Sequence, residues 1–224
     1  MNQELWTDVD NYLVENLIPA DPALDKALKS NQAAGLPTID VAPNQGKLLH
    51  LLARIQGARR ILEIGTLGGY STIWLARALP SDGNLVTLEV EAKHAEVARA
   101  NIERAGLSSL VQLRLGPALE SLLQLQKEGA KPFDLIFIDA DKQNIPAYLE
   151  WSLRLSRPGT VIITDNVIRD GAIINAEDPD PRVQGVRRLF EMMSADPRLD
   201  ATALQTVGTK GYDGFTLAIV KAAP

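Results

Sequence analysis

The sequence predicts an α/β fold: a seven-stranded, mostly parallel sheet with an antiparallel edge strand, flanked by helices and preceded by extra N-terminal helices. Three observations predict this class. Apolar runs of strand length alternate with segments of helical periodicity from residue 58 onward. The runs at 135–138 and 161–163 are continuous, as in strands buried on both faces. The last two strand-like segments are separated only by residues 208–214, which predicts a hairpin at one edge of the sheet.

The N-terminal part of the chain is predicted to be helical. Apolar residues recur at helical spacing before Pro19 and again before Gly35, and a third helix is expected from Pro43 to Gly57. We expect the strands at residues 60–65, 85–90, 111–115, 133–139, 160–165, 201–207 and 215–220. Helical patterns separate the first five. A chain of 224 residues is expected to form a single domain, 1–224, with a helical cap at 1–57 and an α/β core at 58–224.

Composition excludes several functional classes. The net charge of −5 argues against broad binding to nucleic acids or anionic membranes, because phosphate contacts need a concentrated basic face. The chain has no cysteine, which excludes disulfides, thiolate metal sites and a cysteine nucleophile. The first residues lack the basic and apolar regions of a signal peptide, and no apolar run is long enough to span a bilayer. We expect a cytoplasmic protein.

A glycine-rich turn carries the clearest functional signal. An apolar run ends at Gly65, Gly68 and Gly69 and then enters a helical segment. Such a turn lets backbone N–H groups approach a ligand and presents a helix N-terminus to it. The spacing is not the G-x-G-x-x-G of a dinucleotide site. Because Glu63 lies just before the turn, a ligand with positive charge, such as a sulfonium with an ammonium group, is favoured over a pyrophosphate.

Glu89 lies near the carboxyl end of the second predicted strand, downstream of the glycine-rich turn. An acidic side chain at this point of a β-α-β unit can hold both hydroxyls of a ribose. The alternative is an ordinary solvated residue at a strand end. The combination with the turn favours the cofactor role.

Two further strand ends carry a second group of polar residues. Asp139 and Lys142 follow the fourth strand of the alternating region, and Asp165 and Asn166 follow the fifth. Ligands of open α/β sheets bind at the carboxyl ends of strands. Two carboxylates and an amide oxygen suit Mg²⁺, with water or substrate oxygens completing the octahedron. The alternative is that acidic and amide residues end strands because they make good turns and caps.

Three motifs together resemble a known family. Residues 62–71 (LEIGTLGGYS), 133–142 (FDLIFIDADK) and 164–167 (TDNV) look like those of the cation-dependent, S-adenosylmethionine-dependent O-methyltransferases. This group includes the caffeoyl-CoA and catechol O-methyltransferases and their bacterial relatives. The resemblance implies a Rossmann-like class I methyltransferase fold, with S-adenosylmethionine and a divalent cation, expected to be Mg²⁺, as cofactors.

The resemblance also implies roles for individual residues. The expected cofactor contacts are Val41, Glu63, Gly65, Thr66, Gly69, Ser71, Glu89, Ala118 and Asp139. The expected metal ligands are Asp139, Asp165 and Asn166, and the expected catalytic residues are Lys142 and Asp139. Two positions depart from the family pattern: Asn44 stands where many relatives have glutamate, and Arg169 where plant-type members often carry tryptophan. We expect both departures, and the loop at 167–181, to bear on the acceptor.

These residues support in-line transfer of a methyl group to a phenolic, catechol-like hydroxyl of a small molecule. A metal-bound phenol ionises more easily, and Lys142 could accept or stabilise the proton that leaves. An alternative is a tRNA enzyme that methylates a hydroxylated uridine, since bacterial members resemble that activity too. A third reading, an NAD-dependent oxidoreductase or a non-catalytic nucleotide-binding module, has the glycine spacing against it.

The N-terminal helices also predict self-association. They carry more apolar surface, including Trp6, Tyr12 and Leu17, than a lid over a cofactor needs. We therefore expect a homodimer in which part of this surface is buried. The alternative is that these helices only pack on the sheet.

Overall fold

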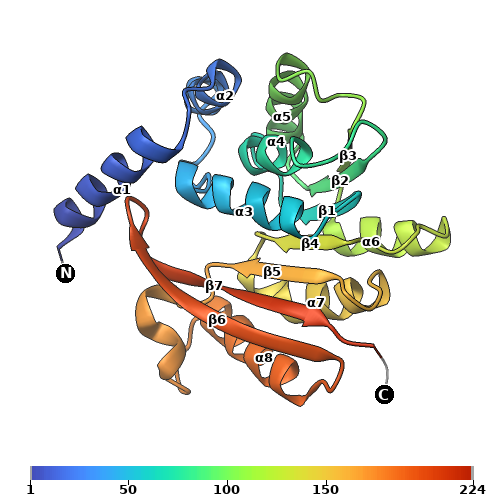
Figure 1. The fold of residues 1–224 in the computed structure, drawn as a ribbon. Coiled ribbons are helices and arrows are strands. Elements are labelled where there is room, and N and C mark those ends of the chain that lie inside the picture. Colours follow the sequence, from blue (N-terminus) through green and yellow to red (C-terminus); the bar gives the residue numbers. More distant parts are fainter. Residues whose placement is uncertain (1, 223–224) are drawn as a thin grey trace.

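The computed structural model describes residues 2–222 and contains one mixed sheet (Figure 1). In spatial order its strands are β3 (Val111–Leu115), β2 (Asn84–Glu89), β1 (Arg60–Ile64), β4 (Leu135–Ile138), β5 (Val161–Asp165), β7 (Gly211–Val220) and β6 (Leu199–Gly208). The first five are parallel, and β7 is antiparallel to both of its neighbours. The predicted seven-stranded, mostly parallel sheet with an antiparallel edge is confirmed. The strand order reverses direction between β1 and β4, which is where such sheets bind ligands.

Helices cover both faces of the sheet (Figure 1). One face is covered by α2 (Pro22–Ala33), α3 (Pro43–Ile55), α4 (Tyr70–Ala76) and α5 (Ala92–Arg104), and the other by α6 (Ala118–Lys127), α7 (Ile145–Arg154) and α8 (Pro181–Ala195). The remaining helices are α1 (Gln3–Leu17) and the 3₁₀ helices η1 (Lys142–Asn144) and η2 (Arg169–Ile174). Within the described part of the chain, none of these helices has both the length and the apolar character that crossing a bilayer requires.

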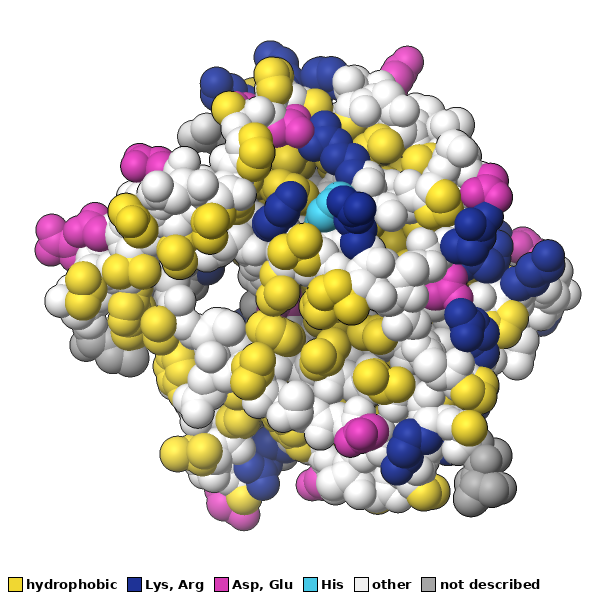
Figure 2. Space-filling model, viewed as in Figure 1, with side chains coloured by type: hydrophobic (Ala, Val, Ile, Leu, Met, Phe, Trp, Pro, Cys, Tyr) yellow, Lys and Arg dark blue, Asp and Glu magenta, His cyan; other side chains and the backbone are white. Residues whose placement is uncertain are grey.

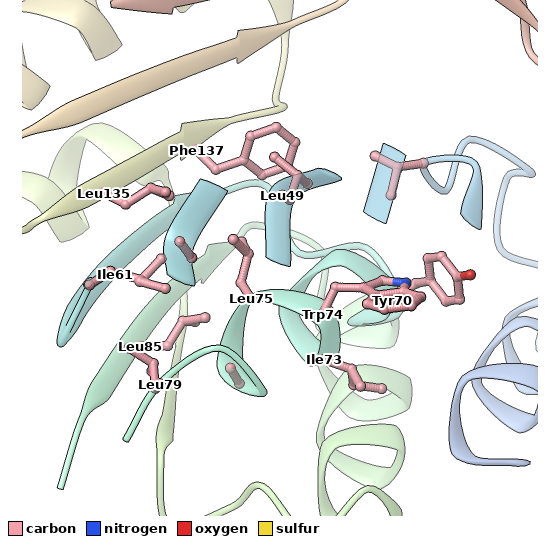
Figure 3. Packing of buried hydrophobic residues seen from close by; sticks show 14 of the residues in the cluster. Leu49, Ile61, Tyr70, Ile73, Trp74, Leu75, Leu79, Leu85, Leu135 and Phe137 are labelled. Atoms are coloured by element: carbon pink, nitrogen blue, oxygen red, sulfur yellow. The ribbon is translucent and has the colours of Figure 1, made fainter. Parts of the chain in front are cut away.

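Alternate residues of the central strands fill two separate cores. Ile61, Leu135 and Phe137 pack with α3 and α4 in the core of the first face (Figure 3). Leu62 and Ile136, which are their chain neighbours, pack with α6, α7 and α8 on the second face. Successive side chains of a strand point to opposite faces of a sheet, so a continuous apolar run is what a strand covered on both faces needs.

Several predicted strand boundaries differ from the structure by one to four residues, and two of these differences have a physical explanation. The fourth strand was expected from residue 133, but β4 begins at Leu135, because the backbone N–H of Phe133 donates to the carbonyl of Leu155, at the end of α7, and not to a neighbouring strand. The connection between the last two strands was expected at 208–214. The ladder instead continues to the pair Gly208 and Gly211, which leaves a two-residue turn.

Helix α1 is fastened to the tip of this hairpin. The buried carboxylate of Asp10 accepts the backbone N–H of Thr209 at 2.7 Å and the side-chain amide of Asn44, on α3, at 2.8 Å. Gly208 leaves room for it, because a Cβ there would lie 2.4 Å from Asp10 Oδ2. One side chain therefore ties α1 to both α3 and the antiparallel edge of the sheet.

Candidate active site

A cavity of about 720 Å³ opens at the carboxyl ends of the parallel strands. Most of the residues predicted as functional line it: Val41, Gly65, Thr66, Ser71, Glu89, Ala118, Asp139, Lys142 and Asn166. Three predicted residues, Glu63, Gly69 and Asp165, do not line the cavity and lie behind its wall. The sequence therefore located the cavity, and the structure separates the residues on its surface from those that support them.

The backbone of the loop after β1 needs glycine. Gly65 has φ = +99°, and a Cβ on it would lie 2.0 Å from the carbonyl oxygen of Asp139. Gly69 has φ = +83° and forms the N-cap of α4. Both conformations are rarely adopted by other residues. Gly65 lets the loop pass directly against the end of β4, so that the predicted cofactor contacts and the predicted metal ligands lie around one space, whereas Gly69 packs against Ala98 of α5.

Glu89 holds this loop in place. Its Oε2 accepts the backbone N–H groups of Leu67 at 2.8 Å and Thr66 at 3.3 Å, and its Oε1 accepts those of Val90 and Glu91, both at 2.9 Å. Glu89 is buried, although it lines the cavity. Besides the predicted ribose contact, this carboxylate thus fixes the conformation of the glycine-rich loop.

Glu63 is fully buried beneath the loop and accepts hydrogen bonds from three hydroxyl groups. These belong to Ser71, Thr72 and Thr87, with Ser71 Oγ at 2.7 Å from Glu63 Oε1. Burial raises the pKa of Glu63 to about 7, despite these hydroxyl donors, which lower it. Of these three donors, Ser71 is the one that lines the cavity, so Glu63 is linked to the cavity through the Ser71 hydroxyl and offers a neighbouring cation a carboxylate near its ionisation point.

The two strand-end carboxylates are held by different partners. Asp139 Oδ1 accepts a hydrogen bond from Lys142 Nζ at 2.9 Å, and this lysine is itself buried. Asp165 Oδ2 accepts one from Gln45 Nε2 at 2.7 Å, and its Oδ1 accepts the backbone N–H of Asn166 at 2.9 Å. Burial, and then the charge of Asp139, raise the pKa of Asp165 well above its ordinary value.

The residues present fit a divalent cation. The charge of Asp139 raises the proton affinity of Asp165, a repulsion that a cation between them would relieve. Among residues 2–222 there is no cluster of three or more histidine, cysteine, aspartate or glutamate side chains suited to a metal. The donor set therefore consists of two carboxylates and the amide of Asn166, the hard-oxygen chemistry of Mg²⁺ or Ca²⁺. Asn166 has φ = +56°, which places its side chain at the turn directly after β5.

Several cavity residues were not anticipated. Asp40, His94, Tyr148 and Arg182 line the same space. Asp40 directly precedes the predicted contact Val41 and could have been found from it. The other three come from helices whose amphipathic patterns carried no functional signal.

The two departures from the family pattern differ in their outcome. Arg169 lines the cavity, as expected of a residue that bears on the acceptor. Asn44 does not line it and instead binds Asp10 of α1. It is the next residue, Gln45, that reaches the candidate metal ligands. The loop at 167–181 contains η2, and of this loop only Arg169 lines the cavity.

Comparisons with known proteins agree with this geometry. A family model described as O-methyltransferase matches residues 19–221. The chain is 56% identical to a catechol O-methyltransferase of Niastella koreensis, covering 99% of this chain and 100% of that protein. It is 55% identical to a catechol O-methyltransferase of Mycobacterium tuberculosis, covering 96% of each.

Solved structures give the same picture. An O-methyltransferase from Bacillus cereus in complex with SAH superposes with a TM-score of 0.97 at 62% identity, covering 98% of this chain and 100% of that one. The O-methyltransferase TomG from Streptomyces achromogenes, involved in tomaymycin synthesis and in complex with SAM, superposes with a TM-score of 0.96 at 53% identity, covering 99% and 100%.

Proposed function

This chain belongs to the O-methyltransferase family, and on that premise we propose that it moves a methyl group from S-adenosylmethionine to a catechol-type hydroxyl with the help of a divalent cation. Family membership decides against the oxidoreductase and the non-catalytic module considered above. One observation carries the proposal: the glycine-rich loop, the Asp139–Lys142 pair and Asn166 line a single cavity.

The cofactor half is proposed around the loop after β1. S-adenosylmethionine and S-adenosylhomocysteine are bound in two of the similar structures named above. The cationic methionine part of S-adenosylmethionine would lie near Ser71, with the carboxylate of Glu63 behind that residue. A positive charge there would favour the ionised form of Glu63. Glu89 and Ala118 line the cavity where the ribose and adenine are expected.

The acceptor half is proposed around the two strand-end carboxylates. Asp139, Asp165 and Asn166 would hold the cation, which when bound supplies Lewis acidity that lowers the pKa of a phenol from about 10 and orients two adjacent hydroxyls. Gln45 fixes the rotamer of Asp165 through its hydrogen bond to Oδ2. The two relatives named as catechol O-methyltransferases support an acceptor of this kind.

We propose that Lys142 assists the loss of the proton from the acceptor hydroxyl. Its ammonium group lies 2.9 Å from Asp139 Oδ1, in a buried position at the start of η1. There it can stabilise the phenolate oxygen and guide the departing proton toward solvent. The protein's larger contribution is alignment of sulfur, methyl and oxygen, since this transfer needs no covalent intermediate.

The test is a methyl-transfer assay that compares catechols, acyl-CoA phenolics and hydroxyuridine tRNA, each with and without a chelator. We expect methylation of the catechols that is lost with chelator and restored by Mg²⁺. Methylation of the tRNA alone would replace the proposed acceptor. Catechol methylation that persists in excess chelator would remove the metal from the proposal.

We also propose that the protein is a homodimer. Leu5, Tyr12 and Leu17 of α1 are each more than half exposed, and hydrophobic side chains gather over this helix at the left of Figure 2. Apolar surface of this extent on a helix that projects from the sheet is typical of an interface. The C2 symmetry usual for dimers would pair this face with its own copy.

A further inference from the structure

Two arginines line the cavity, and their charges are balanced differently. Arg182, in the first turn of α8, faces Asp180, whose carboxylate accepts hydrogen bonds from both Nε and Nη2 at 2.6–3.0 Å. The nearest carboxylate to Arg169 is that of Asp213, and Arg169 Nη1 lies 3.8 Å from its Oδ2. That distance is beyond hydrogen-bonding range. Arg182 is therefore neutralised within the protein, whereas Arg169 is only weakly paired.

Asp213 is already engaged by the backbone. Its Oδ1 accepts the N–H groups of Ile168 at 2.8 Å, Gly214 at 2.9 Å and Arg169 at 3.1 Å. One oxygen of this carboxylate is therefore committed to the turn that carries Arg169, and the other, Oδ2, lies 3.8 Å from the guanidinium without a hydrogen bond to it. Nε of Arg169 is buried and has no hydrogen-bond partner among the described residues. Because a buried donor without a partner is costly, the site favours a ligand that supplies an acceptor.

The turn that carries Arg169 fixes where the side chain begins. Asn166, Arg169 and Asp170 have φ values of +56°, +55° and +55°, a region that side-chain-bearing residues seldom adopt. Asp213 stabilises this turn by accepting the N–H groups of Ile168 and Arg169, and the Val167 N–H donates to the carbonyl of Gly214 at 3.0 Å. Arg169 thus starts from a constrained backbone, three residues after the candidate metal ligand Asn166.

Among the described residues, no carboxylate that lines the cavity lies within 4.0 Å of the Arg169 guanidinium, and its one weak partner, Asp213, does not line the cavity. Under the proposed function, Asp139 and Asp165 face the cation, and Glu63 faces the cationic part of the cofactor. Asn166 and Arg169 line the same cavity and are three residues apart on one turn, so Arg169 is available to a ring substituent of an acceptor held at the cation by its two hydroxyls. We propose that Arg169 binds an anionic substituent of the acceptor, so that catechol carboxylates are preferred over neutral catechols. A guanidinium suits this role because its planar donors match a carboxylate in a bidentate pair.

This inference rests on the proposed function, and its test compares two acceptors of nearly equal shape. They are 3,4-dihydroxybenzoate and its methyl ester, assayed with S-adenosylmethionine and Mg²⁺. We expect wild type to prefer the acid, and Arg169→Gln to lower the acid-to-ester ratio of kcat/KM by about ten-fold, mainly through the KM of the acid. Arg169→Lys keeps the charge without the planar donors and should recover part of the ratio.

Gln and Lys are suitable replacements because each meets about the same backbone cost as Arg at φ = +55°. Equal thermal unfolding midpoints would exclude a folding defect as the cause. Arg188→Gln, an exposed arginine of α8 that pairs with Glu191 outside the cavity, is the matched control and should leave the ratio unchanged.

The outcomes separate the two proposals. Equal losses for acid and ester in Arg169→Gln, or no change in either, would overturn the role of Arg169 and leave the catechol methyltransferase standing. A ratio that falls in Arg182→Gln and not in Arg169→Gln would also overturn it. Failure of wild type to methylate either compound would overturn the proposed function itself, and this inference with it.

Discussion

Glu63 makes a sharp test of how burial controls charge in this fold. Its carboxyl is fully buried, and its pKa rises from 4.5 to about 7 on folding. The folded state therefore binds this proton more tightly than the unfolded state does. The resulting stabilisation is fully present below pH 4.5, is lost progressively as the pH rises, and is gone once the pH has passed about 7.

The size of the effect follows from the shift. Each pKa unit corresponds to about 1.4 kcal/mol, so a rise from 4.5 to about 7 amounts to about 3 kcal/mol of folding free energy between pH 4.5 and 7. Glu63→Gln is neutral at every pH and of nearly the same shape. Its stability relative to wild type should therefore increase by about 3 kcal/mol on going from pH 4.5 to pH 8.

The assay is urea denaturation of the cofactor-free protein, wild type and Glu63→Gln, at several pH values across this range. The raised pKa of Asp165 affects both proteins equally and cancels in the difference. The sign of the change matters as much as its size, because the stability of wild type relative to Glu63→Gln should be greatest at the acid end of the range. A difference that stays constant across the range would refute the argument that a buried, neutral Glu63 is present in the folded protein.

Four further predictions test the other elements. Asp165→Ala should lower the rate of catechol methylation by about a hundred-fold or more, while calorimetry shows little change in S-adenosylhomocysteine affinity, since Asp165 and the glycine-rich loop lie at different strand ends. Full activity of this variant in excess chelator would contradict the prediction. Glu89→Ala should weaken S-adenosylmethionine binding by at least about ten-fold, because four backbone N–H groups lose their acceptor; an unchanged dissociation constant would exclude the role. Gly65→Ala should cost at least about 2 kcal/mol of stability, because its Cβ meets Asp139; an unaltered unfolding midpoint would be inconsistent with that contact. Leu17→Glu should convert a dimer into monomers in sedimentation velocity, and a wild type that is monomeric at micromolar concentration would disprove the dimer.

Much of the fold could be predicted because its signals are local. The apolar run that forms β4 has no other stable place than between two layers of helices. The end of the hairpin was missed because the first four residues of β7, Gly211 to Gly214, include two glycines and an aspartate, residues that are typical of turns. Its pairing near Gln205 and Gly214 depends on backbone hydrogen bonds, which leave no apolar pattern in the sequence.

The candidate site divides in the same way. Asp139 and Lys142 are three residues apart, so their contact at 2.9 Å follows from local geometry. The hydrogen bond of Gln45 to Asp165 joins residues 120 positions apart and depends on how α3 docks on the sheet. The turn at Arg169 was hidden for a different reason: its left-handed backbone is imposed by Asp213, on another strand, and not by glycine.

Helix α3 serves both halves of the cavity. Val41, two residues before its start, lines the proposed cofactor half, and Gln45 in its first turn reaches Asp165 in the proposed metal half. A helix moves as a stiff rod, so a displacement that adjusts one of these contacts also changes the other. Substitutions that shift α3 in order to change the preferred acceptor will therefore also change cofactor affinity. Substitutions at the η2 turn leave the position of α3 unchanged.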